Sequence, residues 1–252
     1  KVASPNRIVA ASIHGLKMSN YAGEKKDVNV LLIVDSSKLT LKYRHRRLRS
    51  LKDVAVSLLV VDQKTFKKDA ERDWLGGLLV ENMLTPYQPL TNRDFLWDQE
   101  VKVKKRIVIE ILGNLVLEYP EMSHELLIKP EYFMFECMAR KASLYPPITH
   151  RFLAILRSNA PEEEREHIMK GFNAALEEAA EEELLTFSDG HVKIVKEYID
   201  TIQRRKLRVL NLLKAVRNSI LRHSVEVFPK MMRSLIEDYG LYTKQLLETE
   251  YY

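Results

Sequence analysis

The stretch that decides the fold is DVNVLLIV, residues 27–34, where Asp27 and Asn29 lead into an unbroken aliphatic run. Similar apolar runs occupy residues 7–13 and 54–61, and polar or glycine residues bound each of them. Continuous runs of four to eight apolar residues are typical of strands that are buried at the centre of a sheet. The sequence therefore predicts a sheet built around these three strands in the first third of the chain.

Helical periodicity dominates the rest of the chain. A helix is expected from Thr65 towards Leu84, interrupted by Gly76-Gly77, and the apolar spacing within residues 101–118 predicts a second one. Asp189-Gly190, between residues 186–187 and 192–195, predicts a β-hairpin. Further helices are expected over residues 132–142, 148–156, a stretch that begins after Ser158 or Asn159, and 172–185.

The predicted fold class is α+β with two domains. Residues 1–118 are expected to form a mixed sheet with flanking helices, and residues 119–252 a mainly α-helical domain with a hairpin at 186–195. Helix, helix and hairpin follow one another as in a winged helix-turn-helix, and an ordinary helical domain with one turn explains the pattern equally well. The helix before the hairpin holds five glutamates that would repel phosphates, so we expect a wing to pack on protein. These residues are Glu177, Glu178, Glu181, Glu182 and Glu183.

Composition excludes several classes of protein. The 252 residues include a single cysteine, Cys137, which we expect to be a buried structural thiol, so a disulfide scaffold is excluded. No apolar run approaches the length that a bilayer requires. The sequence opens on Lys1 without a secretory signal pattern, from which we expect a processed start and a cytoplasmic location.

Charge is distributed unevenly along the chain. Residues 1–110 hold 21 Lys or Arg against 13 Asp or Glu, whereas residues 111–252 hold 19 against 22, for a net charge of +5. A basic first half favours a polyanionic partner such as nucleic acid or a nucleotide. Surface ion pairs of a heat-adapted protein would give a similarly charge-rich composition.

Residues 11–15, ASIHG, and residues 23–34, GEKKDVNVLLIV, resemble the opening of the nucleotidyltransferase superfamily with its minimal, polymerase-beta-like fold. The resemblance covers roughly residues 7–85. In that family a Gly-Ser turn binds the triphosphate, Asp-x-Asp on the next strand holds two divalent metals, and a later strand adds a third carboxylate. It implies nucleotide binding at Ser12 and Gly15, metal binding at Asp27 and Asn29, and catalysis by Asp27. Mg²⁺ would be the cofactor of an active enzyme.

The sequence departs from this family at three positions. Ala11 stands in place of glycine, Asn29 in place of the second aspartate, and Ser57 in place of the third. An amide cannot balance the charge of two cations, so we expect catalysis to be lost. Two alternatives stay open: Asp53 or Asp62 supplies the missing carboxylate in an active nucleotidyltransferase, or the resemblance is accidental and another α/β domain is present.

A basic stretch with one aromatic residue follows the second predicted strand. An aromatic ring among cations can stack on a base while its neighbours bind phosphates. A solvated hairpin tip is the structural alternative. The expected nucleic-acid-binding residues are Lys42, Tyr43, Arg44, Arg46, Arg47, Arg49 and Lys52.

A long helix is predicted from residue 195 to near Pro229, with a heptad-like apolar seam that includes Val209 and Leu213. This seam supports another hypothesis, in which the protein is a non-enzymatic assembly factor that dimerises or docks a partner through the helix.

Overall fold

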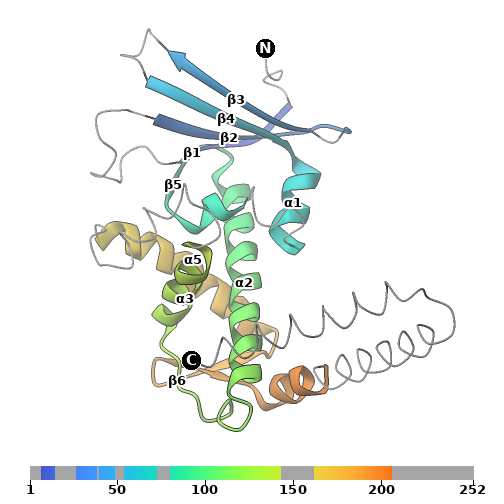
Figure 1. The fold of residues 1–252 in the computed structure, drawn as a ribbon, viewed down its shortest axis with the longest axis vertical. Coiled ribbons are helices and arrows are strands. Elements are labelled where there is room, and N and C mark those ends of the chain that lie inside the picture. The colour runs from blue at the N-terminus through green and yellow to red at the C-terminus, as the bar shows by residue number, and fades with distance from the viewer. Residues whose placement is uncertain are drawn as a thin grey trace, which may run out of the picture. The chain divides into compact units, whose positions relative to one another are not determined.

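A computed structural model describes residues 7–14, 27–38, 40–48, 54–72, 80–142 and 162–205, without the side chains of 27, 45–48, 54–55, 81–82 and 140–142. The fold is mixed α+β, as predicted, with a five-stranded sheet in the order β3-β4-β2-β1-β5 (Figure 1). The strands are β1 (Ile8–His14), β2 (Asp27–Val34), β3 (Leu41–Leu48), β4 (Val54–Asp62) and β5 (Tyr87–Thr91).

The three strands predicted from apolar runs, β1, β2 and β4, are confirmed and lie inside the sheet. β2 pairs in parallel with β4 and antiparallel with β1, so both of its edges are hydrogen-bonded. β3 and β5 pair antiparallel to β4 and β1 and form the two edges. β5 contains Pro89 opposite Ser12, at an edge where a residue without a backbone N–H is tolerated.

The sheet has an inner face, which the helices α1 (Gln63–Arg72) and α2 (Arg93–Glu118) cover in Figure 1, and an outer face on the other side. Inner-face residues of neighbouring strands are almost fully buried; they include Ala10, Ser12, Leu31, Ile33 and Val61. Outer-face residues such as Val28 and Val30 are half-buried. The main core therefore lies between the sheet and the helices.

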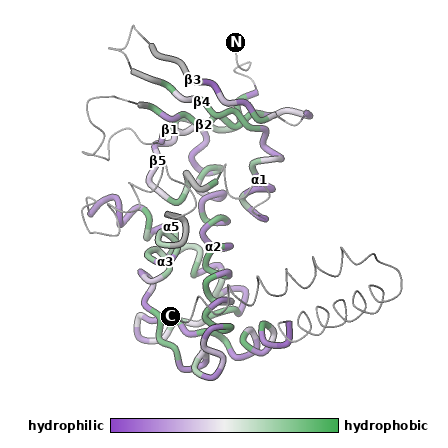
Figure 2. Tube along the Cα trace, in the orientation of Figure 1, coloured by the Kyte–Doolittle hydropathy of each residue, from purple (hydrophilic) through white to green (hydrophobic). Residues whose placement is uncertain are grey.

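Residues 41–48 of the basic stretch after β2 form the edge strand β3, whereas Arg49 and Lys52 lie outside the described residues. An edge strand pairs on one side only, here with β4, so it does not need the apolar run that a central strand shows. Leu41, Lys42, Tyr43 and Arg44 are exposed, and Figure 2 shows that the first part of β3 is more hydrophilic than the strands beside it.

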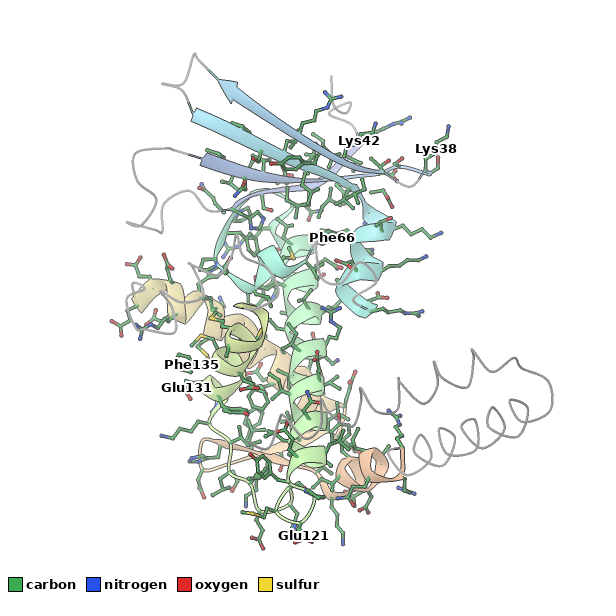
Figure 3. The ribbon with its side chains drawn as sticks, viewed as in Figure 1. Lys38, Lys42, Phe66, Glu121, Glu131 and Phe135 are labelled. Atoms are coloured by element: carbon green, nitrogen blue, oxygen red, sulfur yellow. The ribbon has the colours of Figure 1, made fainter. Side chains whose placement is uncertain are left out.

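The helix predicted from Thr65 to Leu84 is shorter than expected. α1 ends at Arg72, and a short 3-10 helix, η3 (Glu81–Leu84), precedes β5. Gly76-Gly77 lies outside the described residues. Phe66 on α1 is completely buried beneath the sheet (Figure 3).

Within the described ranges, three long helices follow the sheet: α2, α3 and α5. α2 begins at Arg93, earlier than predicted, because Asn92 accepts a hydrogen bond from the Phe95 backbone nitrogen and caps it. α3 (Pro130–Ala142) confirms the helix predicted over 132–142. α5 (Glu162–Glu181) is one helix, so the separate helix predicted over 172–185 is wrong. Its buried residues form one continuous stripe: Glu164, Ile168, Gly171, Phe172, Ala175, Leu176 and Ala179.

The predicted hairpin is confirmed as β6 (Leu185–Ser188) and β7 (His191–Ile194). Asp189 and Gly190 both have positive φ angles, 49° and 74°, which is the backbone that a two-residue hairpin turn of this kind requires. Ile128, between α2 and α3, forms a bridge with Val192 of β7. Val192 and Ile194 are buried, so the hairpin packs on protein.

The chain divides into two compact units, residues 1–199 and 200–252. The domain boundary predicted at residue 118 coincides with the end of α2 and falls within the first unit. Residues 196–205 are helical, at the start of the predicted C-terminal helix, and its seam residues Val209 and Leu213 lie outside the described residues. Cys137 is buried. Within the described part of the chain, no helix has the length and apolar character needed to cross a membrane.

Candidate functional site

A row of polar residues crosses the inner face of the sheet near the end where β1 finishes and β2 begins. His14 of β1 lies opposite Asn29 of β2, and Asn29 lies opposite Ser57 of β4. Directly opposed residues of neighbouring strands project from the same face of a sheet. We call His14, Asn29 and Ser57 the polar row; His14 is buried, Ser57 is half-buried and Asn29 is exposed.

Tyr43 joins this row from the edge strand. It lies opposite Leu59, which in turn lies opposite the buried Leu31, so the tyrosine belongs to the inner face. Its hydroxyl donates a hydrogen bond of 3.1 Å to Ser57 Oγ, its diagonal neighbour on β4. The side chain is nevertheless 66% exposed. The hydroxyl is therefore held at the row while most of the ring faces solvent.

The predicted nucleotide-binding residues are not both in a turn. Ser12 lies inside β1 and is completely buried, and its hydroxyl forms a 2.9 Å hydrogen bond with His14 Nε2. β1 continues one residue beyond the strand predicted over residues 7–13 and ends at His14. Gly15, which comes next in the chain, lies outside the described residues.

The residues predicted to bind metal offer a poor set of donor atoms for Mg²⁺. Asn29 is beside Ser57, as the resemblance implied, but both are neutral, whereas Mg²⁺ is usually bound through carboxylates. The backbone of Asp27 pairs with Ala55, and its side chain lies outside the described residues. Among the residues described, no three His, Cys, Asp or Glu side chains are placed to hold a metal ion. The described donors therefore do not fit a two-metal centre.

Asp62 does not replace a missing carboxylate. It ends β4 at the opposite end of the sheet, where its two carboxylate oxygens accept hydrogen bonds from the backbone nitrogens of Thr40 and Thr65. Burial alone would raise the pKa of Asp62, but these hydrogen bonds outweigh it and lower the pKa. Asp62 is thus the N-cap of α1, and Asp53 lies outside the described residues.

Five of the seven predicted nucleic-acid-binding residues belong to β3. Lys42 and Arg44 flank Tyr43 in an extended strand, so they project from the outer face, and both are exposed. Among the described residues neither has an acidic side chain within ion-pair distance. Arg46 and Arg47 belong to β3 with side chains outside the description, and Arg49 and Lys52 lie outside it entirely.

A cluster that the sequence did not predict lies beside the polar row and combines the buried His14 with the half-buried Tyr87 and His167. The ring of Tyr87 on β5 lies 5.6 Å from the His14 ring and 6.0 Å from the His167 ring of α5, between ring centres. Burial, and then the negative charge of Glu100, raise the pKa of Tyr87 far above its usual value. Burial also lowers the pKa of His167, partly offset by Glu100. The tyrosine hydroxyl stays protonated and the imidazole stays neutral near pH 7.

The same cluster contains a buried ion pair. Lys104 Nζ lies 2.6 Å from Glu100 Oε1, and both side chains are 1% exposed. The ammonium also donates a 2.9 Å hydrogen bond to the Ile168 carbonyl oxygen and lies over the Phe172 ring. Burial lowers the pKa of Lys104, and Glu100 partly offsets this effect. The pair therefore links α2 to α5.

Gly171 makes room for this pair. A Cβ atom on Gly171 would lie 2.5 Å from Glu100 Oε1 and from Lys104 Nζ. The available signal in the sequence was the spacing of Glu100 and Lys104, which places opposite charges one turn apart on α2 among apolar residues. That spacing is common on solvated helix faces, so it does not by itself predict burial.

Comparison with models of protein families finds no family that matches this chain, and comparison with curated proteins finds no similar sequence. The assignment of a function therefore depends on the residues of the sheet and its edge.

Proposed function

We propose that this protein binds nucleic acid through the β3 edge of a nucleotidyltransferase-like sheet whose metal site has lost most of its acids. The observation that carries the proposal is the edge strand itself. Lys42 and Arg44 are exposed there without an acidic neighbour among the described residues, and the largely exposed Tyr43 lies between them. Cations that are not neutralised by the protein can replace the counterions of a phosphate backbone.

The polar row supports the second half of the proposal. Asn29 and Ser57 are neighbours on adjacent strands, which is the placement that two metal-binding carboxylates of the resembling family would need. Their neutral side chains can donate and accept hydrogen bonds, but they supply no negative charge for a cation. We therefore expect binding without metal-dependent nucleotidyl transfer.

The alternative of an active nucleotidyltransferase is tested separately. Full-length protein is incubated with labelled nucleoside triphosphates and Mg²⁺ or Mn²⁺, with Asp27→Ala as the control. Label transfer that the substitution abolishes would establish catalysis and overturn the loss that we propose. Equal background in both proteins is the expected result.

We propose further that α2, α3, α5 and the hairpin form a winged-helix-type arrangement. The helices α2, α3 and α5 and the hairpin follow in that order among the described residues, and the isolated bridge residue Ile128 pairs with the second hairpin strand, β7. α5 would be the recognition helix, but its exposed side carries glutamates such as Glu166, Glu177 and Glu181. This arrangement therefore serves protein packing in our proposal, and the nucleic acid binds at β3.

Binding is tested by fluorescence anisotropy with labelled random-sequence RNA and DNA oligonucleotides over a series of salt concentrations. We expect the variant Lys42→Gln with Arg44→Gln to bind more weakly at low salt. Its plot of log affinity against log salt should be shallower by about 0.7–0.9 for each phosphate that the variant no longer binds.

The matched control removes two exposed lysines elsewhere, Lys102→Gln with Lys129→Gln, and so changes the net charge by the same amount. This control should keep most of the affinity. Wild-type binding that is absent, or that does not respond to salt, would refute the proposed function. Equal losses in the two double variants would show that only the overall charge matters.

A further inference from the structure

We infer that the ligand of the β3 edge is single-stranded, with a base stacked on Tyr43 and the adjoining phosphates bound by Lys42 and Arg44. This inference deepens the proposed function and rests on it. It names the class of nucleic acid that the geometry of one strand can accept.

The aromatic ring of Tyr43 and the cations of Lys42 and Arg44 lie on opposite faces of the sheet. Tyr43 faces inward, since its hydroxyl reaches Ser57 on the inner face, and Lys42 and Arg44 alternate to the outer face. Figure 3 shows Lys42 on the side of the sheet away from Phe66 and the helices. A ligand that contacts all three side chains must therefore pass around the edge of β3.

A single strand of nucleic acid can pass around that edge, whereas a duplex cannot. β3 is the last strand of the sheet, so no described strand blocks its outer side. In a duplex the bases are stacked and paired inside the helix, and a base face cannot turn to one side while its phosphates turn to the other. A single strand can splay a base away from its backbone and stack it on an aromatic side chain.

A hydrogen bond to the neighbouring strand positions the Tyr43 ring. The 3.1 Å hydrogen bond to Ser57, a diagonal neighbour, directs the Tyr43 side chain across β4 while the ring stays largely exposed. The ring is thus held before the ligand arrives, which lowers the entropic cost of stacking. The exposed Asn29, opposite Ser57, offers an amide that can hydrogen-bond the edge of a nearby base.

The test compares the full chain with single-stranded and duplex oligonucleotides of one sequence, by fluorescence anisotropy at fixed salt. We expect the single strand to bind at least about tenfold more tightly. Tyr43→Ala should weaken single-strand binding by roughly 5- to 100-fold, the range for loss of one stacked base, and change duplex binding by less than about twofold.

Two further variants separate stacking from positioning. Tyr43→Phe keeps an aromatic ring and loses the hydrogen bond to Ser57, so its affinity for the single strand should fall between those of wild type and Tyr43→Ala. Ser57→Ala should match Tyr43→Phe. Thermal melting of each variant checks that the fold is intact, which we expect because the Tyr43 side chain is 66% exposed.

The outcomes distinguish the two proposals. If wild type binds neither form of nucleic acid, the proposed function fails. This inference fails if wild type binds duplex as well as single strand, or if Tyr43→Ala weakens the binding of both equally. The proposed function still stands in either case, provided that the double variant of Lys42 and Arg44 loses affinity. Full affinity of Tyr43→Ala for the single strand would also overturn the inference.

Discussion

The edge strand β3 and the contact between α2 and α5 use the same kinds of cation in opposite ways. On β3, Lys42 and Arg44 are exposed and have no acid within ion-pair distance among the described residues. On α2, Lys104 is paired with Glu100. The next residue, Lys105, reaches two glutamates of the α5 region: Glu178 at 3.1 Å and Glu182 at 2.7 Å.

This difference shows that the excess of basic residues in the first half of the chain has two origins. Lys104 and Lys105 of α2 belong to the fold, because carboxylates of the same chain neutralise them. Lys42 and Arg44 of β3 have no such partner among the described residues, so they remain available to an external anion. Substitutions in the two regions should therefore affect different measurements, stability for α2 and binding for β3.

The largest effect is expected at the buried pair. Lys104→Met leaves the Glu100 carboxylate buried without its partner, which should cost about 3–5 kcal/mol of the free energy of unfolding. Chemical denaturation monitored by circular dichroism measures this loss. The substitution is close in size to lysine, so the loss reflects charge more than volume.

A double variant provides the control. Glu100→Leu with Lys104→Met removes both charges, and replacing a buried pair by apolar side chains is often close to neutral. We expect this variant to recover most of the lost stability. If the single and double variants are equally destabilised, the pair is needed for its shape or hydrogen bonds rather than for mutual neutralisation.

The next effect concerns the space around the pair. Gly171→Ala places a methyl group 2.5 Å from Glu100 Oε1 and Lys104 Nζ, so the pair must shift. Overpacking of this kind costs about 1–3 kcal/mol. Urea denaturation measures it, with Asn173→Ala on the exposed side of α5 as a control that should stay within about 0.5 kcal/mol of wild type. A stable Gly171→Ala variant would mean that the two helices separate easily.

The carboxylate of Asp62 differs from that of Glu100, because it is held by two backbone N–H groups rather than by a lysine. Asp62→Ala removes the N-cap of α1 and should cost about 0.5–2 kcal/mol at pH 7. The folded pKa lies below the unfolded one, so the stabilisation is present above the unfolded pKa and is lost as pH falls through the folded pKa. The difference between wild type and variant should therefore shrink in acid.

Denaturation of Asp62→Asn at pH 7 and pH 2 tests the same carboxylate. The asparagine still offers one oxygen to Thr40 or Thr65, but not two. We expect a smaller loss of stability than for Asp62→Ala, with a weaker dependence on pH. A difference from wild type that stays constant with pH would contradict the lowered pKa.

The central strands are predictable from the sequence because a strand that is buried on both faces has a continuous run of apolar residues. The apolar runs predict β1, β2 and β4 in this way, and the Asp189-Gly190 pair predicts the hairpin turn. β3 has no apolar run, since an edge strand tolerates polar residues that are also common in loops. Tyr43 lies on one face of the sheet and Lys42 and Arg44 on the other. This arrangement can be predicted only when the stretch is known to be a strand.

The polar row is predictable in part. The resemblance matches Asn29 and Ser57 to two ligands of one site, and the register places them side by side. The cluster of Tyr87, Glu100 and His167 is not predictable, because its members come from three elements that only the tertiary fold brings together. The resemblance places Ser12 in a phosphate-binding turn. In the structure, Ser12 lies within a strand, and its hydroxyl forms a hydrogen bond with His14, two residues further along the same strand.

The smallest effect on stability is expected at β3. Lys42→Gln with Arg44→Gln removes no ion pair seen among the described residues, so the free energy of unfolding should stay within about 0.5 kcal/mol of wild type. Lys105→Gln is the matched substitution on α2, and it breaks two ion pairs that are partly exposed, at a cost of about 0.2–1 kcal/mol. Urea denaturation and salt-dependent binding are measured on the same preparations. The comparison holds if Lys105→Gln lowers stability more than affinity and the β3 variant does the reverse. A β3 variant that unfolds more easily than Lys105→Gln would mean that its cations serve the fold after all.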